Sequence, residues 1–303
     1  MHPYALFAVS TLIWGTTWYA ITFQLAAVAP ELGVALRFAF AGGLILAFCL
    51  WRGISLRYRP REHAQIALLG LTNYSVSYIL IYHAEQHIVS GLVAVGYAGA
   101  PLINMLIARW MLGTPLSRRV AVGGGLGLAG IALIFWPELA ALQSNPAVLL
   151  GAVQTAIAVL ISCYGNVCVG KLYDEGVSGW GPLGLSMLWG GAISLAAAVL
   201  MGVPLTIELG AAFIGSFLYL ALFGSVLAFG AYFALIGRIG AARASYVGVM
   251  SPVLALMMSA VFEGYDWRLA TVLGVGLAVA GNVIALWQPR SRRAQGRPLE
   301  SRA

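Results

Sequence analysis

The chain has 303 residues, of which 61% are hydrophobic and only 9% are charged, and its net charge is +7. Soluble domains carry about 25% charged and about 45–50% apolar residues, so this composition excludes an ordinary soluble domain and favours a membrane protein. The basic residues are spread between apolar runs, which argues against a nucleic-acid surface. The three cysteines lie inside apolar runs and indicate small buried side chains rather than a disulfide framework.

Apolar runs recur along the whole chain, and a helix needs about 20 apolar residues to cross the core of a bilayer. The sequence therefore predicts an all-α membrane protein with the lipid bilayer as its surroundings. The predicted transmembrane helices lie near residues 4–23, 32–51, 64–83, 89–111, 120–136, 147–170, 180–201, 209–235, 242–262 and 268–287.

The basic residues predict the orientation of these helices. Cytoplasmic loops are enriched in Lys and Arg, and all 17 such residues except Arg37 and Arg268 fall on one set of alternate loops or in the tail. We therefore expect a multi-pass protein of the cell inner membrane with both termini in the cytoplasm, and hence an even number of spans. The segment 289–303 is predicted to be a basic cytoplasmic tail near anionic headgroups.

The two halves of the sequence resemble each other. A shift of 151 residues places Pro101 on Pro252, and it also aligns glycines and one tryptophan without a gap: Gly113 with Gly264, Gly123 with Gly274, Gly125 with Gly276, Gly130 with Gly281 and Trp136 with Trp287. We predict one repeat at 1–140 and a second at 141–288. Because each repeat holds five spans, an odd number, the second must enter the membrane from the opposite side, as in many secondary transporters.

The stretch GLGLAG at 125–130 matches the G-x-G-x-x-G pattern of dinucleotide-binding turns. No strand precedes it, and no acidic residue follows about 20 positions later, as that fold requires. We interpret the glycines as helix-packing positions, with Gly123 and Gly127 forming one small-xxx-small pair and Gly276 and Ala280 forming another.

Four stretches carry a resemblance to a known family. They are WGTTWYAI at 14–21, LRFAFAG at 36–42, APLINMLIARWMLG at 100–113 and SPVLALMMSAVFEG at 251–264. In this order, together with the repeat, they make the chain similar to the drug/metabolite transporter superfamily, and within it to the EamA family and its YddG-type amino-acid exporters. One departure is that Gly113 is followed by Thr114 and Pro115, whereas the family often has Glu after the glycine that ends its fourth helix. In the second half the acid, Glu263, precedes Gly264.

The resemblance implies export of a small-molecule substrate, with amino acids, including aromatic ones, as the leading class, by alternating access through a central cavity. Uptake or drug efflux is the alternative within the superfamily, and a signalling or scaffolding membrane protein without solute flux is the alternative from another class. In the family, helices one, three, four, six, eight and nine surround the cavity. This arrangement adds three candidates on the sixth span, Gln154, Tyr164 and Asn166.

Aromatic residues and prolines supply further candidates for the cavity wall. Paired helix breaks at matching positions of two repeats point to a transport site, so Pro101 and Pro252 are the expected hinges, each about halfway along a span. The predicted lining residues share helical spacing or lie beside these prolines: Trp14, Trp18, Tyr74, Tyr78, Tyr82, Tyr97 and Tyr246. Plain packing is the alternative for each ring, and an interfacial aromatic belt is a second alternative for Tyr82.

Charged and titratable residues leave several alternatives open. Arg37 is the only cation well inside a span, and it either contacts the substrate or extends to water, in which case Glu31 is its nearest partner in sequence. The HAEQH stretch at 83–87 lacks the zincin order, so an ordinary polar turn is favoured over proton sensing or a metal site. No acid lies in mid-span, so proton coupling stays open. We expect no cofactor, no resident metal and no enzymatic activity.

Overall fold

A computed structural model describes residues 2–113, 118–140, 146–239 and 247–286. Over these ranges the chain is helical, apart from turns and one isolated bridge between Val28 and Ile207. Seven helical stretches in this part are long and apolar enough to cross a membrane, judged by length and composition, and three shorter apolar helices lie at Ala121–Trp136, Met250–Phe262 and Leu269–Gly281. The predicted all-helical fold is thus confirmed for the described residues, and its apolar helices are consistent with a membrane protein.

The helices have the following bounds. In the first half they are α1 (Pro3–Leu25), α2 (Pro30–Trp51), α3 (Pro60–Leu71), η1 (Thr72–Val76), α4 (Ser77–Ala84), α5 (Ser90–Tyr97), α6 (Ala100–Leu112) and α7 (Arg118–Ala140). In the second half they are α8 (Pro146–Asp174), α9 (Trp180–Leu200), α10 (Ala211–Leu218), η2 (Tyr219–Leu227), α11 (Ala228–Ile239), α13 (Val247–Phe262) and α14 (Leu269–Leu286).

Local sequence explains many of these ends. Proline stands at the first position of α1, α2 and α3, where its fixed φ suits a helix and its missing N–H costs nothing. Gly113 and Gly264 follow α6 and α13 in the left-handed conformation, with φ of 67° and 69°. Glycine adopts this conformation without strain, so these aligned residues end corresponding helices in the same way.

Two helical stretches contain π-helical turns, η1 between α3 and α4 and η2 between α10 and α11. The shift of 151 residues places Thr72–Val76 on 223–227, which is the last part of η2. The same irregularity therefore occurs at matching positions of the two halves. Such π turns leave backbone groups unpaired and often occur at functional sites.

The two aligned prolines differ in their surroundings. The helix is interrupted between α5 and α6, and Pro101 lies in the first turn of α6. Pro252 lies inside α13, which is uninterrupted over its described length. Pro252 falls early in that helix, where it removes a single backbone hydrogen bond. A break is therefore confirmed at Pro101 alone, and the hinge role of both prolines stays a prediction.

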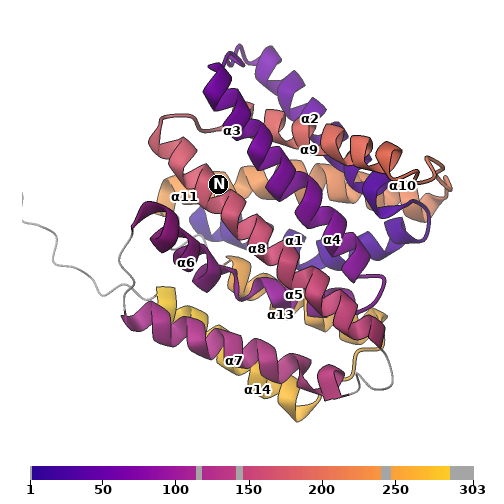
Figure 1. Ribbon diagram of the computed structural model, residues 1–303, viewed down its shortest axis with the longest axis vertical. Coiled ribbons are helices and arrows are strands. Elements are labelled where there is room, and N and C mark those ends of the chain that lie inside the picture. The colour runs from indigo at the N-terminus through magenta and orange to yellow at the C-terminus, as the bar shows by residue number, and fades with distance from the viewer. Residues whose placement is uncertain (1, 114–117, 141–145, 240–246, 287–303) are drawn as a thin grey trace, which may run out of the picture.

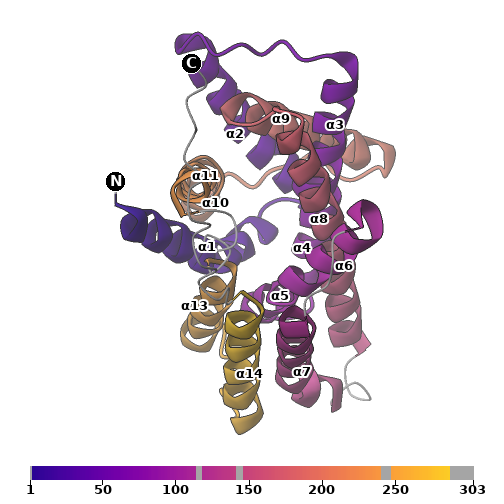
Figure 2. The same ribbon diagram turned by 90° about the vertical axis from the view of Figure 1, so that its left-hand side faces the viewer.

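Helices pack against partners from the other half of the chain. In both ribbon views α7 and α14 lie side by side at one end of the molecule, and α2, α3 and α9 lie at the other end (Figures 1 and 2). Between these ends, α13 contacts α1 and α5, and α1 also contacts α11. The interior of the bundle is therefore built jointly by both halves.

The interface of α7 with α14 explains the glycine pattern at 123–130. A Cβ on Gly130 would lie 2.5 Å from the carbonyl oxygen of Gly274 and 2.6 Å from the backbone nitrogen of Ala278. Added carbons on Gly274 and Gly281 would likewise meet the backbone of α7. Close helix packing is thus the observed role of this surface, as small residues permit in lipid.

The predicted pair Gly276 and Ala280 was wrong, because both positions face away from α7. A Cβ on Gly276 would meet nothing within 4 Å, and Ala280 is exposed. The small residues that touch α7 are Gly274, Ala278 and Gly281 instead. A helix has 3.6 residues per turn, so Gly276, two positions from both Gly274 and Ala278, points to a different face.

Candidate substrate site

Arg37 on α2 is the centre of a buried polar site. Its side chain is 1% exposed, and its Nε donates a hydrogen bond to Oγ of Ser225 on η2 at 3.2 Å. The guanidinium carbon lies 5.0 Å from the centre of the Tyr78 ring and 5.1 Å from that of Phe38, within the range of cation–π attraction. Its Nη1 is buried without a hydrogen-bond partner. Nη1 of Arg37 is therefore a buried donor that makes no hydrogen bond within the described residues.

The irregular helix η2 makes room for this guanidinium. A Cβ on Gly224 would lie 3.3 Å from Nη2 of Arg37 and 2.8 Å from Thr17. The carbonyl of Gly224 accepts a hydrogen bond of 3.2 Å from Nε1 of Trp14, and the hydroxyl of Ser225 donates to the carbonyl of Leu220. The π turn and its glycine thus bring the second half against Arg37.

Arg37 does not extend to water, which removes one of the two alternatives left by the sequence. Its nearest predicted partner, Glu31, instead contacts His83, with Oε1 of Glu31 and Nε2 of His83 2.8 Å apart. Glu31 is itself 2% exposed. His83 also lies 3.3 Å from Oε1 of Gln86 through its other ring nitrogen. The HAEQH stretch is thus tied to the start of α2.

No group of three or more His, Cys, Asp or Glu side chains that could hold a metal occurs in the part of the chain that the structure describes. His83 instead contacts Glu31 and Gln86. The stretch is a helix end followed by a turn, since α4 ends at Ala84 and Glu85 is its C-cap.

Tyr82 and Gln24 extend the polar site toward α1. The Tyr82 hydroxyl donates a 2.6 Å hydrogen bond to Oε1 of Gln24, and both side chains are fully buried. Tyr82 is thus fully buried, which argues against the aromatic-belt alternative for it. Nε2 of Gln24 has no hydrogen-bond partner. It is a second buried donor that makes no hydrogen bond.

Glu85 lies at the end of α4, and sequence reasoning did not include it in the site. Both of its carboxylate oxygens are buried without a hydrogen-bond partner. Burial raises the pKa of this carboxyl well above its usual range; the charge of Glu263 raises it further, whereas the charge of Arg37 lowers it. A search for acids in the middle of apolar spans misses Glu85, because it lies in the turn after α4. The burial of its oxygens depends on other helices and cannot be seen in the local sequence.

The predicted aromatic residues fall into two groups. Trp18 and Tyr97 lie 5.4 Å apart between ring centres, and the indole nitrogen of Trp18 is buried without a hydrogen-bond partner. Trp14 packs 5.0 Å from Phe229 and near Tyr232, in a separate apolar cluster. Tyr97 also contacts Oγ of Ser162 on α8 at 3.2 Å.

Tyr74 and Tyr78 both pack on Phe38, with ring centres 5.2 and 4.7 Å away. Tyr74 is buried, and an added Cβ on Gly190 of α9 would collide with its backbone, so Tyr74 fills the contact between η1 and α9. Of this pair, Tyr78 is the ring that the Arg37 guanidinium faces.

The candidates on α8 lie apart from Arg37. Oδ1 of Asn166 accepts a 2.9 Å hydrogen bond from Nδ2 of Asn73 on η1. Tyr164 is half-buried, and Oε1 of Gln154 is buried without a partner. Tyr246 lies outside the described residues. The structure thus brings Arg37 against Tyr78, bonds Tyr82 to Gln24 and pairs Trp18 with Tyr97. It gives the α8 candidates other neighbours.

A polar contact joins α5 to α13. The Glu263 carboxylate accepts hydrogen bonds from the backbone N–H of Ser90 at 3.2 Å and from its hydroxyl at 2.6 Å, and it also contacts the Ser259 hydroxyl. Ser259 accepts a 2.8 Å bond from the N–H of Gly91. These groups satisfy donors at the start of α5, as a helix cap does.

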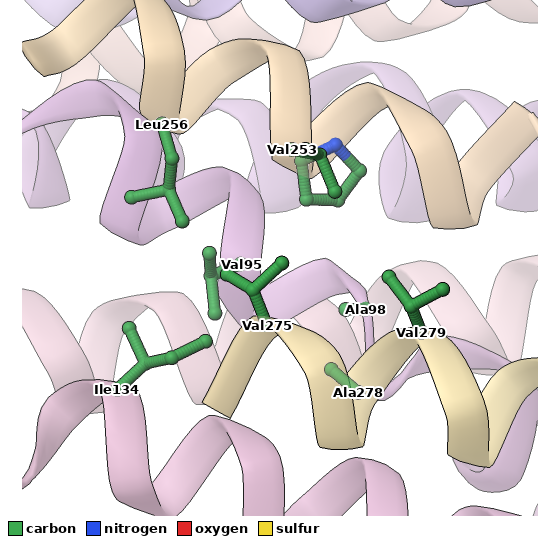
Figure 3. Close-up of a pocket in the computed structure, with 9 residues that line it drawn as sticks. Val95, Ala98, Ile134, Val253, Leu256, Val275, Ala278 and Val279 are labelled. Carbon is green, nitrogen blue, oxygen red and sulfur yellow. The ribbon is translucent and has the colours of Figure 1, made fainter. Parts of the chain in front are cut away.

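A small pocket lies between α5, α7, α13 and α14, and its lining is apolar (Figure 3). Pro252 lines it together with Val253, Leu256, Val275 and Val279. The pocket offers contact for apolar groups, and the polar site around Arg37 does not line it.

Buried polar groups from several helices, inside a bundle of apolar spans, are typical of polytopic membrane transport proteins. Comparison with known proteins specifies the family. The EamA-like transporter family model matches residues 2–136 and 148–287, so the chain belongs to this family of the drug/metabolite transporter superfamily.

Several relatives are similar along most of their length. The inner membrane transporter YedA of Escherichia coli (strain K12) is 30% identical over 286 residues, covering 92% of this chain and 89% of YedA. PecM of Dickeya dadantii is 28% identical, covering 95% and 94%. A protein of Streptantibioticus cattleyicolor named "Probable terminal-alkyne amino-acid exporter" is 24% identical, covering 81% and 78%.

A crystal structure of another protein shares the fold. Its TM-score to this chain is 0.67 at 20% sequence identity, and the match covers 93% of this chain and 95% of the other.

Proposed function

We propose that this chain is a secondary transporter that exports small metabolites across the inner membrane, with amino acids, aromatic ones among them, as its substrate class. Family membership supports transport, and the name of the Streptantibioticus relative supports amino-acid export. The observation that carries the proposal is buried Arg37, whose Nη1 has no hydrogen-bond partner. A guanidinium with a donor that makes no hydrogen bond can bind a carboxylate, which accepts charge-assisted hydrogen bonds.

The proposed architecture is two inverted repeats of five spans each, 1–140 and 141–288, followed by the tail 289–303. Two separate matches of the family model, at 2–136 and 148–287, support this division. The matching π turns at η1 and η2 support it further. Both termini are cytoplasmic in this proposal, on the basis of the Lys and Arg distribution.

Alternating access supplies the mechanism in this proposal. Arg37, Gln24 and Tyr82 are buried, so a solute reaches them only when the surrounding helices move. We assign the hinge to Pro101 and Pro252, and the solute wall to Trp18, Tyr78, Tyr82 and Tyr97, with Trp14, Tyr74, Gln154, Tyr164, Asn166 and Tyr246 as outer candidates. The helix break between α5 and α6 supports flexibility at Pro101.

Flux into and out of proteoliposomes tests the proposal, with a panel of amino acids and cationic drugs and with or without a pH gradient. We expect counterflow of at least one amino acid, and its loss in Arg37→Gln. Arg61→Gln is the matched control, because Arg61 is exposed and contacts Glu175 at 3.7 Å. Transport of drugs alone would favour drug efflux, and absence of any flux in correctly inserted protein would favour a scaffolding role.

A further inference from the structure

We propose that Glu85 binds the ammonium group of the substrate while Arg37 binds its carboxylate, so that the transporter selects zwitterions. This inference rests on the proposed transport function and deepens it. Glu85 thereby becomes a specificity-determining residue of the same site, although it lies in a turn.

The first support is a matched pair of groups without partners. Both Glu85 oxygens are buried and accept no hydrogen bond, and Nη1 of Arg37 is buried and donates none. The charges of the two side chains interact, since the charge of Arg37 lowers the pKa of Glu85. Yet among the described residues the ion pairs within 4.0 Å are Arg61–Glu175 and His83–Glu31, and Arg37–Glu85 is not one of them. The acid and the base are therefore not paired with each other.

The second support is energetic. A buried carboxylate without a partner is costly, and so is a buried guanidinium donor without an acceptor. A zwitterion bound between them would give the carboxylate a cation and the guanidinium an anion in one step. A solute with only one charged end would leave the other residue unsatisfied, which is how a site with buried polar groups rejects an incomplete ligand.

The third support is the helical register. Tyr78, Tyr82 and Glu85 are spaced by four and three residues, and Glu85 keeps α-helical φ and ψ of −68° and −11°. These three side chains therefore lie along one face of α4. Tyr78 stacks under Arg37, and Tyr82 hydrogen-bonds to Gln24 beside it. The face that presents the tyrosines to the site thus also carries Glu85.

Neighbouring acids do not serve this role, because they are engaged elsewhere. Glu31 contacts His83, and Glu263 accepts hydrogen bonds from Ser90 and Ser259. Glu263 also disfavours the charged form of Glu85. An incoming ammonium would reverse that effect, because a nearby positive charge favours an ionised carboxyl.

The experiment compares solute pairs that differ only at the amine. Phenylalanine, leucine and threonine are each assayed against their N-acetyl derivatives by counterflow in proteoliposomes. We expect the wild-type protein to prefer the free amino acid at least tenfold, and Glu85→Gln to reduce that preference at least tenfold. Glu208→Gln is the matched control, since Glu208 is an exposed acid in a loop, and it should keep the wild-type preference.

Two further measurements keep the outcome decisive. Glu85→Asp retains the charge and should keep part of the preference even if Glu85→Gln inserts poorly. In detergent, the transported amino acid should raise the melting temperature of the wild type and fail to raise that of Glu85→Gln. An unchanged preference in correctly inserted Glu85→Gln would overturn the role of Glu85, whereas no flux of any amino acid in the wild type would overturn the proposed function itself.

Discussion

Replacing Gly130 with alanine should weaken the packing of α7 against α14. The added Cβ would lie 2.5 Å from the carbonyl oxygen of Gly274, and ordinary contact begins at 3.4 Å, so the two backbones must separate by about 0.9 Å. A gap of that size forfeits about a quarter to a half of the dispersion energy at each contact. Overpacking costs about 1–3 kcal/mol, and the better helix propensity of alanine returns about 1 kcal/mol. We expect a net loss of up to about 2 kcal/mol of unfolding free energy.

Gly125 supplies the matched control, since it lies in the same GLGLAG stretch and a Cβ there would meet nothing within 4 Å. Gly125→Ala should be neutral or more stable by up to about 1 kcal/mol. Thermal unfolding of both variants in the same detergent measures the difference. Equal melting temperatures would refute the close-packing explanation, and loss of stability in Gly125→Ala alone would show that the wrong face was assigned.

Three further predictions concern the polar interior. Ser259→Ala should leave the Gly91 N–H without its acceptor and cost about 1–3 kcal/mol; unfolding in detergent checks this, and an unchanged midpoint would contradict it. Tyr82→Phe should leave Oε1 of buried Gln24 without its donor, with a loss of about 1–3 kcal/mol, whereas a gain in stability would show that the hydroxyl is not needed. Glu85 has a raised pKa in the folded state, so the folded protein should hold a proton that the unfolded chain releases, and wild-type stability should fall as pH rises above about 4.5. Glu85→Gln should remove that fall, so the melting-temperature advantage of the variant should grow with pH; parallel curves would argue against the buried carboxyl.

The amino-acid sequence predicted the membrane class and the helical structure, because apolar length is a property of the chain itself. It also predicted the close packing at Gly123, Gly127 and Gly130, although not that Gly125 faces away from α14, and it predicted the break beside Pro101. It misassigned the matching surface of α14, choosing Gly276 over Gly274. Both choices keep small residues at similar spacing, so only contact with α7 distinguishes them.

The candidate site shows the same division between local and tertiary information. Sequence identified Arg37 and the tyrosines as unusual within apolar spans, since a charge or hydroxyl in lipid is costly without a partner. It could not decide whether Arg37 reached water, because that depends on η2, which lies nearly 190 positions further along the chain and places Ser225 on the guanidinium.

By itself the sequence determined which segments are apolar enough to be helices in a membrane, and which polar and charged residues lie within those segments. Only the tertiary structure decided which of those residues meet. It paired Glu31 with His83, left Nη1 of Arg37 and both carboxylate oxygens of Glu85 without partners, and buried those oxygens although Glu85 lies in a turn. The physical reason is that burial and pairing arise between helices distant in sequence, whereas helical propensity and hydrophobic length are set within each segment.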